Sequence, residues 1–238
     1  MTYLPLGISG VPAGIAVDQS SGRVYVAVAG SNELGVIDGL ANAVVDTIHG
    51  LPDPTAVAVN PSNQLVYVTN SRGPNNPGLL SFIDAGSDNF TGNAIEVGSN
   101  PWAVAVDTAT NRVLVGGNDE VTMVDGNSHT AIGHIAIPNG NPNFQVNGIA
   151  ADAQHKRFFV TTSDTSSTSG AGSTLVVDEG TKAVTAALQT GQAPNGVDYD
   201  PTTDRAYVAN SISSTLSVIT DVLQLEAHPA PCQGGTCI

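Results

Sequence analysis

The chain has 238 residues, of which 41% are hydrophobic and only 12% are charged, and its net charge is −14. This length and apolar share are sufficient for one large all-β domain. The acidic excess argues against nucleic acid as a partner, because phosphate binding needs clustered Lys and Arg. We also expect no membrane insertion, since no apolar run approaches the roughly 20 residues of a membrane helix.

A small apolar strand, a polar turn and a second strand recur five times along the chain. The best-formed copy runs from Pro54 to Asn70. The Asp or Asn that ends the first strand of each copy falls at positions 18, 60, 107, 152 and 200. This period of roughly 40–50 residues is typical of a β-propeller, in which each repeat forms one four-stranded blade.

Each repeat continues with a third strand that ends in Asp and then a fourth strand. The third strands are expected to end at Asp38, Asp84, Asp125 and Asp178. The fourth strands are expected at residues 44–48, 94–97, 131–135 and 184–188. The first strand is nearly all small and apolar, which fits an inner strand that is buried on both faces.

The two ends of the chain predict how the ring closes. The fifth repeat has a third strand at residues 215–220 but no usual turn and fourth strand after it. Residues 3–7 resemble the end of a fourth strand. We therefore predict five four-stranded blades within residues 1–227, closed by the N-terminal strand, which completes the last blade and removes exposed edges. The alternative is that residues 222–227 are themselves the fourth strand. Residues 228–238 form a C-terminal tail.

The second strands of the second and fifth repeats carry a known signature. Tyr67-Val-Thr-Asn70 and Tyr207-Val-Ala-Asn210 resemble the YVTN family of β-propeller repeats, which is also found in archaeal surface-layer proteins. The resemblance covers about residues 11–221. It implies the propeller fold and says little about function, because the family includes surface-layer domains, periplasmic propellers and relatives of haem-d1 propellers. Its members commonly have seven blades, whereas five repeats are visible in this chain.

Four of the repeats share a charge pattern in which an Asp precedes an Arg by five residues. We interpret these Asp residues as caps of the following turn, and the Arg residues as bridges between the two strands of the same hairpin. The alternative is a ring of carboxylates that binds a metal or another cation. The pairs are Asp18 and Arg23, Asp107 and Arg112, Asp152 and Arg157, and Asp200 and Arg205.

The opposite face of the ring carries loops that differ between repeats, and a binding site is expected there. Trp102, the only Trp, stands at the entrance of an inner strand and either lines a pocket or packs between blades. The other ligand-binding candidates on this face are Asn70, Asn147, Asn195, Asn210, Glu33 and Asp119. An enzyme would instead draw on Glu33, Asp119, Glu120 and Asp164.

The only two Cys, Cys232 and Cys237, are separated by four flexible residues and are expected to form a small disulfide loop. A disulfide favours an extracellular, cell-surface or periplasmic location. The residues from Met1 to Gly7 lack the features of a signal peptide, so the chain either stays inside the cell or is a mature form.

These observations favour a non-enzymatic, exported binding or scaffold propeller. We expect a monomer without a cofactor, whose variable loop face holds a small ligand, a glycan or a protein. The alternative is a propeller enzyme, such as a lyase or a lactonase-type hydrolase. Its active site would lie at the mouth of the channel, with or without a divalent cation.

Overall fold

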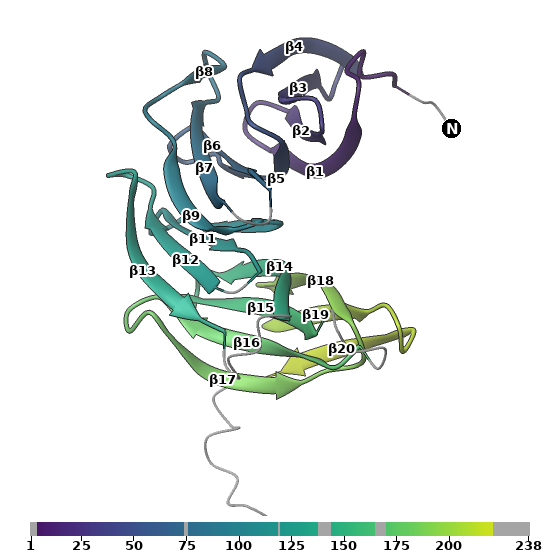
Figure 1. The fold of residues 1–238 in the computed structure, drawn as a ribbon, viewed down its shortest axis with the longest axis vertical. Coiled ribbons are helices and arrows are strands. Elements are labelled where there is room, and N and C mark those ends of the chain that lie inside the picture. Colours follow the sequence, from purple (N-terminus) through teal and green to yellow (C-terminus); the bar gives the residue numbers. More distant parts are fainter. Residues whose placement is uncertain (1–3, 74–75, 119, 138–143, 165–169, 221–238) are drawn as a thin grey trace, which may run out of the picture.

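The structure is a computed structural model that describes residues 4–73, 76–118, 120–137, 144–164 and 170–220. These residues form an all-β fold of five antiparallel sheets, which we call blades 1 to 5 in chain order. The described part of the chain contains no helix, and so no helix long and apolar enough to cross a membrane. The blades stand side by side along an arc, in the manner of a propeller (Figure 1).

The strands follow one another in simple antiparallel order within each blade. Blade 1 contains β1 (Val11–Asp18), β2 (Arg23–Ala29), β3 (Glu33–Asp38) and β4 (Ala43–His49). Blade 2 contains β5 (Pro54–Asn60), β6 (Leu65–Asn70), β7 (Pro77–Asp84), β8 (Asn89–Phe90) and β9 (Ile95–Ser99). Blade 3 contains β10 (Ala103–Asp107), β11 (Arg112–Gly116), β12 (Glu120–Asp125) and β13 (Thr130–Ala136). Blade 4 contains β14 (Phe144–Asp152), β15 (Arg157–Asp164), β16 (Gly172–Asp178) and β17 (Ala183–Gln189). Blade 5 contains β18 (Pro194–Asp200), β19 (Arg205–Asn210) and β20 (Thr215–Thr220).

The inner strands β1, β5, β10, β14 and β18 line the concave side of the arc, and each contacts the next one in this order. Glycine permits the closest of these approaches. A Cβ atom on Gly14 would lie 2.6 Å from Cα of Ala56, and one on Gly148 would lie 2.6 Å from the carbonyl oxygen of Asn195. A larger residue at either position would push neighbouring blades apart.

The core lies between the blades. One face of each blade packs on the facing surface of the next, so that the buried side chains form a cluster at each junction. Between blades 1 and 2, for example, Tyr25, Leu34 and Val36 pack against Val57 and Val68. This head-to-tail burial gives most of the hydrophobic stabilisation of the fold.

The predicted strands and turns are confirmed in most blades, and the Asp residues after the third strands act as turn caps. Oδ1 of Asp38 accepts hydrogen bonds from the backbone N–H groups of Leu40 (2.8 Å) and Ala41 (2.9 Å). The carboxylates of Asp84, Asp125 and Asp178 accept equivalent bonds. Two blades differ from the expected four strands. The fourth strand of blade 2 is split into β8 and β9, and blade 5 has three strands among the described residues.

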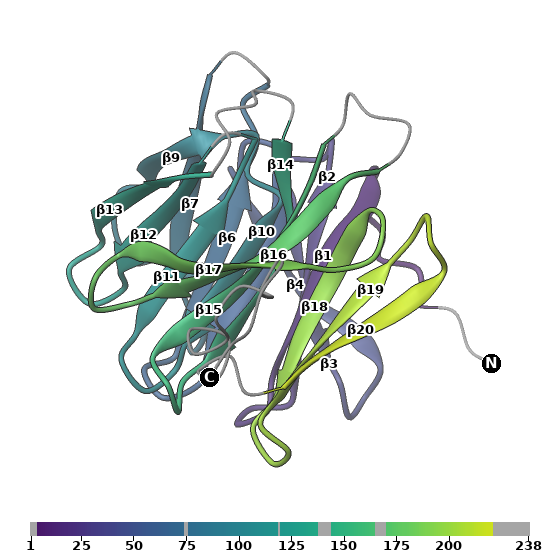
Figure 2. The ribbon, with the colours of Figure 1, turned by 90° about the horizontal axis from the view of Figure 1, so that it is seen from below.

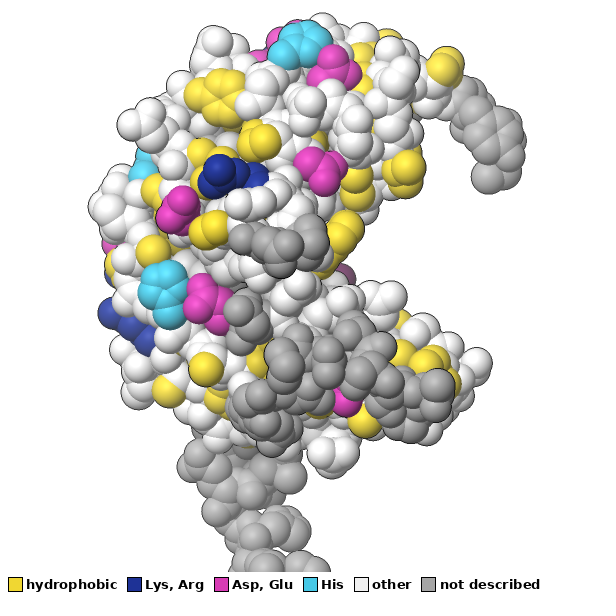
Figure 3. Space-filling model, viewed as in Figure 1, with side chains coloured by type: hydrophobic (Ala, Val, Ile, Leu, Met, Phe, Trp, Pro, Cys, Tyr) yellow, Lys and Arg dark blue, Asp and Glu magenta, His cyan; other side chains and the backbone are white. Residues whose placement is uncertain are grey.

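The predicted closure of the ring is wrong for this structure. Residues 4–7 form no strand, and among the described residues β20 has no partner on its outer edge. The N-terminal segment instead packs on its own blade, where Ile8 lies over Gly35. An opening therefore separates blade 1 from blade 5 (Figures 1 and 3). The physical reason is that side-chain packing at the junctions sets the angle between blades, and one short terminal segment cannot change that angle.

Candidate functional site

Turns and loops gather at the two ends of the strands, which run side by side (Figure 2). We call the surface with the turns after the first and third strands of each blade the hairpin face. We call the opposite surface, with the loops between blades and after the second strands, the loop face. The sequence places its candidate ligand-binding residues on the loop face and its repeated Asp residues on the hairpin face.

Trp102 lies on the loop face with 44% of its surface exposed. The peptide group that precedes its Cα atom is fixed at both of its polar atoms. The N–H of Trp102 donates to the carbonyl of Gly116 (3.0 Å), and the carbonyl of Pro101 accepts a hydrogen bond from Oγ1 of Thr55. The indole is therefore held on a rigid support and is not packed in the core between blades.

Asn70 and Asn210, which end the second strands of blades 2 and 5, are buried and bound to their own blades. Nδ2 of Asn70 donates to the carbonyl of Val68 (2.9 Å) and to Oγ of Ser81 (3.1 Å). Nδ2 of Asn210 donates to Oγ of Ser217 (2.9 Å). These two side chains hold the second and third strands together and are not available to a ligand at the surface.

Asn147 and Asn195 lie near the junction of blades 4 and 5. Nδ2 of Asn147 donates to the carbonyl of Pro194 (2.7 Å) and so links the two blades, while its Oδ1 accepts from Gln145 (2.8 Å). Asn195 is exposed, and its backbone carbonyl accepts a hydrogen bond from Thr161 (2.5 Å). Of the four Asn candidates, Asn195 alone presents an exposed side chain.

The described acidic candidates are divided among blades 1, 3 and 4. Glu33 pairs with His49 across β3 and β4 (2.9 Å), and Glu120 pairs with His134 across β12 and β13 (3.0 Å). Asp119 lies outside the described residues. Asp164 ends β15, and its backbone N–H donates to the carbonyl of Ala171 (2.8 Å).

Among the described candidates, Asn147 and Asn195 lie at one blade junction, and Glu33, Asn70 and Trp102 lie in other parts of the arc. No hydrogen bond or ion pair within the described ranges joins two of the seven candidate residues. Blade 2 separates the Glu33–His49 pair from the Glu120–His134 pair (Figure 1).

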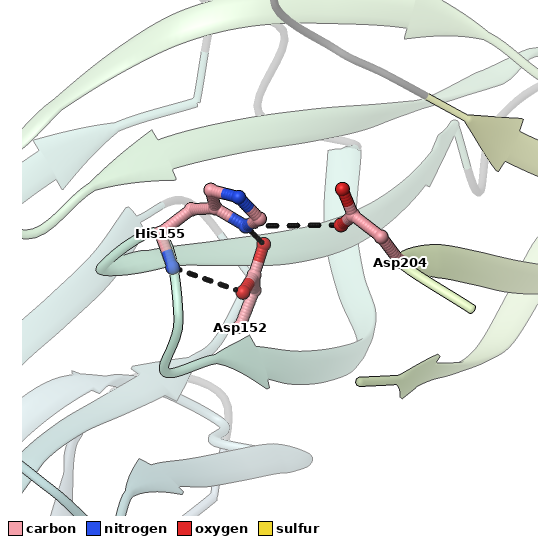
Figure 4. Close-up of side chains that lie close together, drawn as sticks. All are labelled: Asp152, His155 and Asp204. Carbon is pink, nitrogen blue, oxygen red and sulfur yellow. Dashed lines mark hydrogen bonds and ion pairs between the residues drawn. The ribbon is translucent and has the colours of Figure 1, made fainter. Parts of the chain in front are cut away.

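A cluster that the sequence did not single out as a site lies on the hairpin face, where blades 4 and 5 meet (Figure 4). Oδ2 of Asp152, which is fully buried, accepts hydrogen bonds from Nε of Arg157 (2.7 Å) and Nδ1 of His155 (2.8 Å). The same His155 nitrogen lies 3.7 Å from Oδ1 of Asp204, which also accepts a hydrogen bond from the hydroxyl of Tyr199 (2.8 Å). Asp204 and Tyr199 belong to blade 5, so this network joins the two blades.

The surroundings tune the acids of this cluster. Burial alone would raise the pKa of Asp152, but the hydrogen bonds from Arg157 and His155 outweigh it and hold the pKa below its ordinary value. Burial and the hydrogen bond to Asp204 raise the pKa of Tyr199. Asp152 is therefore a stable carboxylate, and Tyr199 is a neutral hydrogen-bond donor.

The ligand types of Asp152, His155 and Asp204 suit a divalent metal, and one ligand atom from each lies within 4.8 Å of the others. The hydrogen bonds argue against that use. Oδ2 of Asp152 already accepts from the permanently charged Arg157, which a cation would have to displace. The arrangement fits an ion-pair network that fastens one blade to the next.

The other blade junctions on the hairpin face contain comparable polar groups with different chemistry. At the junction of blades 1 and 2, Arg23 donates to the carbonyl of Ala85 (2.9 Å) and to Asp88 (2.6 Å). At the junction of blades 2 and 3, Oδ1 of Asn111 accepts from Asn60 (2.8 Å) and from the hydroxyl of Tyr67 (2.5 Å).

These contacts correct the interpretation of the repeated Arg residues. Among the described contacts, Arg157 alone bonds to the Asp five residues before it. Arg23 reaches the next blade, Arg112 pairs with Asp125 on the third strand of its own blade, and Arg205 is exposed. The Asp half of the prediction is confirmed at Asp18, which caps its turn by accepting from the backbone N–H of Ser20 (2.9 Å).

The junction of blades 3 and 4 buries two acids. Glu179 follows β16, is 7% exposed, and accepts a hydrogen bond from Oγ1 of Thr110 in blade 3 (3.0 Å). Asp107, which ends β10, is fully buried beside it. Burial and the hydrogen bond with Asp107 raise the pKa of Glu179 to about 7.

A shallow cavity of about 340 Å³ opens where the first three inner strands reach the hairpin face. It is lined by Val17, Gln19, Val59, Pro61, Ser62 and Thr108. Its size falls at the lower end of small-molecule sites. It carries no titratable group, so its lining offers binding contacts and no acid or base.

Comparisons with known proteins support the fold. No protein-family model matches the chain, and no curated protein sequence matches it. Solved structures do match, with 1142 chains in all. One of them is hydrazine synthase from Kuenenia stuttgartiensis, with a TM-score of 0.71 and 13% sequence identity, over 92% of this chain and 68% of that chain. At this identity the likeness shows the fold alone, and the number of matches indicates that many proteins share it.

Proposed function

We propose that the protein is a non-enzymatic binding propeller of the YVTN type, and that Trp102 is the centre of its binding surface on the loop face. The observation that carries the proposal is the exposed indole on a backbone fixed at Thr55 and Gly116. An aromatic ring that needs no ordering on binding loses little entropy, so it is an efficient contact for a ligand.

The polar surroundings of Trp102 favour a ligand with both an apolar face and hydroxyl groups. Ser71 donates to Asn100 Oδ1 (2.7 Å) next to the Pro101–Trp102 segment, and the N–H of Asn118 donates to the carbonyl of Ser99 (3.0 Å). Sugar rings combine such a face with hydroxyl groups. We therefore place a glycan first among the ligands, ahead of another small molecule or a protein. The low content of charged residues and the predicted disulfide support an exported protein.

Intrinsic fluorescence tests this proposal, because Trp102 is the only Trp in the chain. Titration with a panel of oligosaccharides should shift the emission to shorter wavelength for a bound ligand and reduce quenching by acrylamide. Calorimetry with that ligand should show binding lost in Trp102→Ala and retained in Phe90→Ala. Phe90 is a matched control, because it is 45% exposed on β8. Equal binding by wild type and Trp102→Ala would contradict the proposal.

The alternative function is a propeller enzyme that uses the Glu120–His134 pair as a base and its orienting partner. The pair lies 3.0 Å apart, Thr122 also donates to Oε1 of Glu120 (3.1 Å), and the Glu120 carbonyl accepts from Gly117. We rank this alternative lower because blade 1 contains a corresponding pair, Glu33–His49. A contact that recurs in different blades is expected to fasten the outer strand of a blade and not to catalyse a reaction. Hydrolysis of a lactone or polysaccharide that Glu120→Gln abolished would favour the enzyme.

A further inference from the structure

The two ends of the arc each leave one blade surface uncovered. Each blade has two broad surfaces: the rear surface faces the next blade along the chain, and the front surface faces the previous blade. Within the arc, the rear surface of each blade packs on the front surface of the next. Blade 1 has no blade before its front surface, and blade 5 has no blade after its rear surface (Figure 1). Figure 3 shows the opening between these two surfaces.

The second and third strands of blade 5 repeat the rear-surface pattern of those strands in blade 1, whereas Asp198 on the inner strand stands where blade 1 has Ala16. In blade 1, Tyr25 pairs with Val36, and Ala27 pairs with Leu34. In blade 5, Tyr207 pairs with Val218, and Ala209 pairs with Leu216, in the same register. Leu34 is fully buried against blade 2, whereas Leu216 is 60% exposed. The second and third strands of the last blade thus leave a blade-packing surface exposed at Leu216 and Val218.

The front surface of blade 1 likewise matches that of blade 2. Ile15 occupies the place of Val57 on the inner strand, and it is 69% exposed where Val57 is 7% exposed. The neighbouring strands of blade 1 carry Val24, Val26 and Ile37. These residues occupy the positions that Val66, Val68 and Ile83 have in blade 2. Part of this surface is already covered, since Ile8 lies over Gly35 and Val26 is 6% exposed, whereas Ile15 stays exposed.

Blade 5 also carries the polar donor side chains of a blade junction. At the junction of blades 1 and 2, Arg23 and the hydroxyl of Tyr25 both donate to the carbonyl of Ala85. Blade 5 carries the same pair in the same spacing as Arg205 and Tyr207, and Arg205 is exposed. A front surface placed there would supply the matching carbonyl.

We propose that the two uncovered surfaces bind a partner that itself carries blades of this repeat, and that such a partner completes the ring between blade 5 and blade 1. The partner would place a front surface of β-branched residues on Leu216 and Val218. It would place a rear surface of Tyr, Leu and Val on Ile15 and Val17. This inference is independent of the proposed loop-face ligand.

The shape of the arc favours this occupant over a second copy of the chain. The arc turns most of the way round its axis (Figure 1). A second copy docked with the same junction geometry would therefore drive its later blades into blade 1.

The test extends the full chain with blades of its own repeat. A second copy of residues 8–100, which holds blades 1 and 2, is joined after Ile238 by a flexible linker of about 15 Gly and Ser residues. We expect hydrogen exchange at the amides of Leu216 and Val218 to become at least tenfold slower than in the unextended chain. Leu216→Asp in the extended chain should abolish this protection, whereas the matched variant Leu40→Asp, in an exposed turn, should retain it.

A second extension, with residues 103–189 from blades 3 and 4, guards against added blades that fail to fold, and circular dichroism reports whether the added strands form. Unchanged exchange at Leu216 and Val218 in both extended chains, with the added β-structure present, would overturn the proposal. A dimer of the unextended chain in sedimentation that Leu216→Asp converts to a monomer would also overturn it, because a second copy would then cover these surfaces.

Discussion

Arg157 donates a 2.7 Å hydrogen bond from Nε to Oδ2 of Asp152, and both side chains are buried where blade 4 meets blade 5. His155 donates to the same carboxylate, and Asp204 of blade 5 lies within 4 Å of both Arg157 and His155. A single fully buried carboxylate thus holds the two side chains of blade 4 that face the last blade. Removal of its charge would leave Arg157 with only the half-exposed Asp204 as a nearby carboxylate.

We predict that Asp152→Asn destabilises the protein by about 3–5 kcal/mol, because breaking a buried pair leaves one charge unpaired. Urea unfolding followed by circular dichroism measures the change. Asp204→Asn should cost about 1 kcal/mol or less, because that side chain is half-exposed and solvent screens its charge. Equal costs for the two variants would contradict the role given to Asp152.

Glu179 should make the stability of the fold depend on pH between about 4.5 and 7. Its pKa rises from 4.5 to about 7 on folding. Below pH 4.5 the carboxyl group is protonated in both states, so the folded state carries no penalty. As the pH rises through 7, folding has to bury a charged Glu179, and up to roughly 3 kcal/mol of stability is lost.

The variant Glu179→Gln should flatten this part of the profile and raise the free energy of unfolding at pH 8 relative to wild type. Urea titrations at pH 5, 6, 7 and 8 measure the effect. Glu96→Gln is the matched control, because that side chain is 70% exposed and should leave the profile unchanged. The same slope in wild type and Glu179→Gln would exclude Glu179 as its source.

Asn111 should tolerate Asp better than Ala. Its Oδ1 accepts hydrogen bonds from Asn60 and from Tyr67, both of blade 2, and its backbone has a φ of 55°. Asn111→Ala would leave both buried donors unpaired and place Ala in a left-handed conformation, at a cost of about 2–4 kcal/mol. Asn111→Asp keeps an acceptor and tolerates this conformation, so thermal melting should show a clearly smaller loss. A milder effect of Ala than of Asp would contradict this account.

Cys232 and Cys237 lie outside the described residues, and their disulfide remains a prediction from the sequence. Protein secreted into an oxidising compartment should resist alkylation by iodoacetamide until it is reduced, and should then be modified at both positions. Alkylation before reduction, followed by mass spectrometry of the C-terminal peptide, would show free thiols and remove one argument for export.

The sequence by itself determined the local structure. Hairpins such as Pro54–Asn70 follow from an apolar strand, a polar turn and a second strand, and the caps formed by Asp18 and Asp38 need only hydrogen bonds to the next few residues. The period of the repeat predicted five sheets for the same reason, since each sheet forms from consecutive strands.

The tertiary structure alone decided what depends on the angle and contact between blades. Arg23 and Arg157 occupy the same place in their repeats, yet one reaches the next blade and the other binds its own Asp. The exposure of Trp102, the burial of Asn70 and the opening between Ile15 and Leu216 are likewise set by how neighbouring side chains pack. The packing energy between blades is the total of many weak contacts between residues far apart in the chain, so it cannot be predicted from a local sequence pattern.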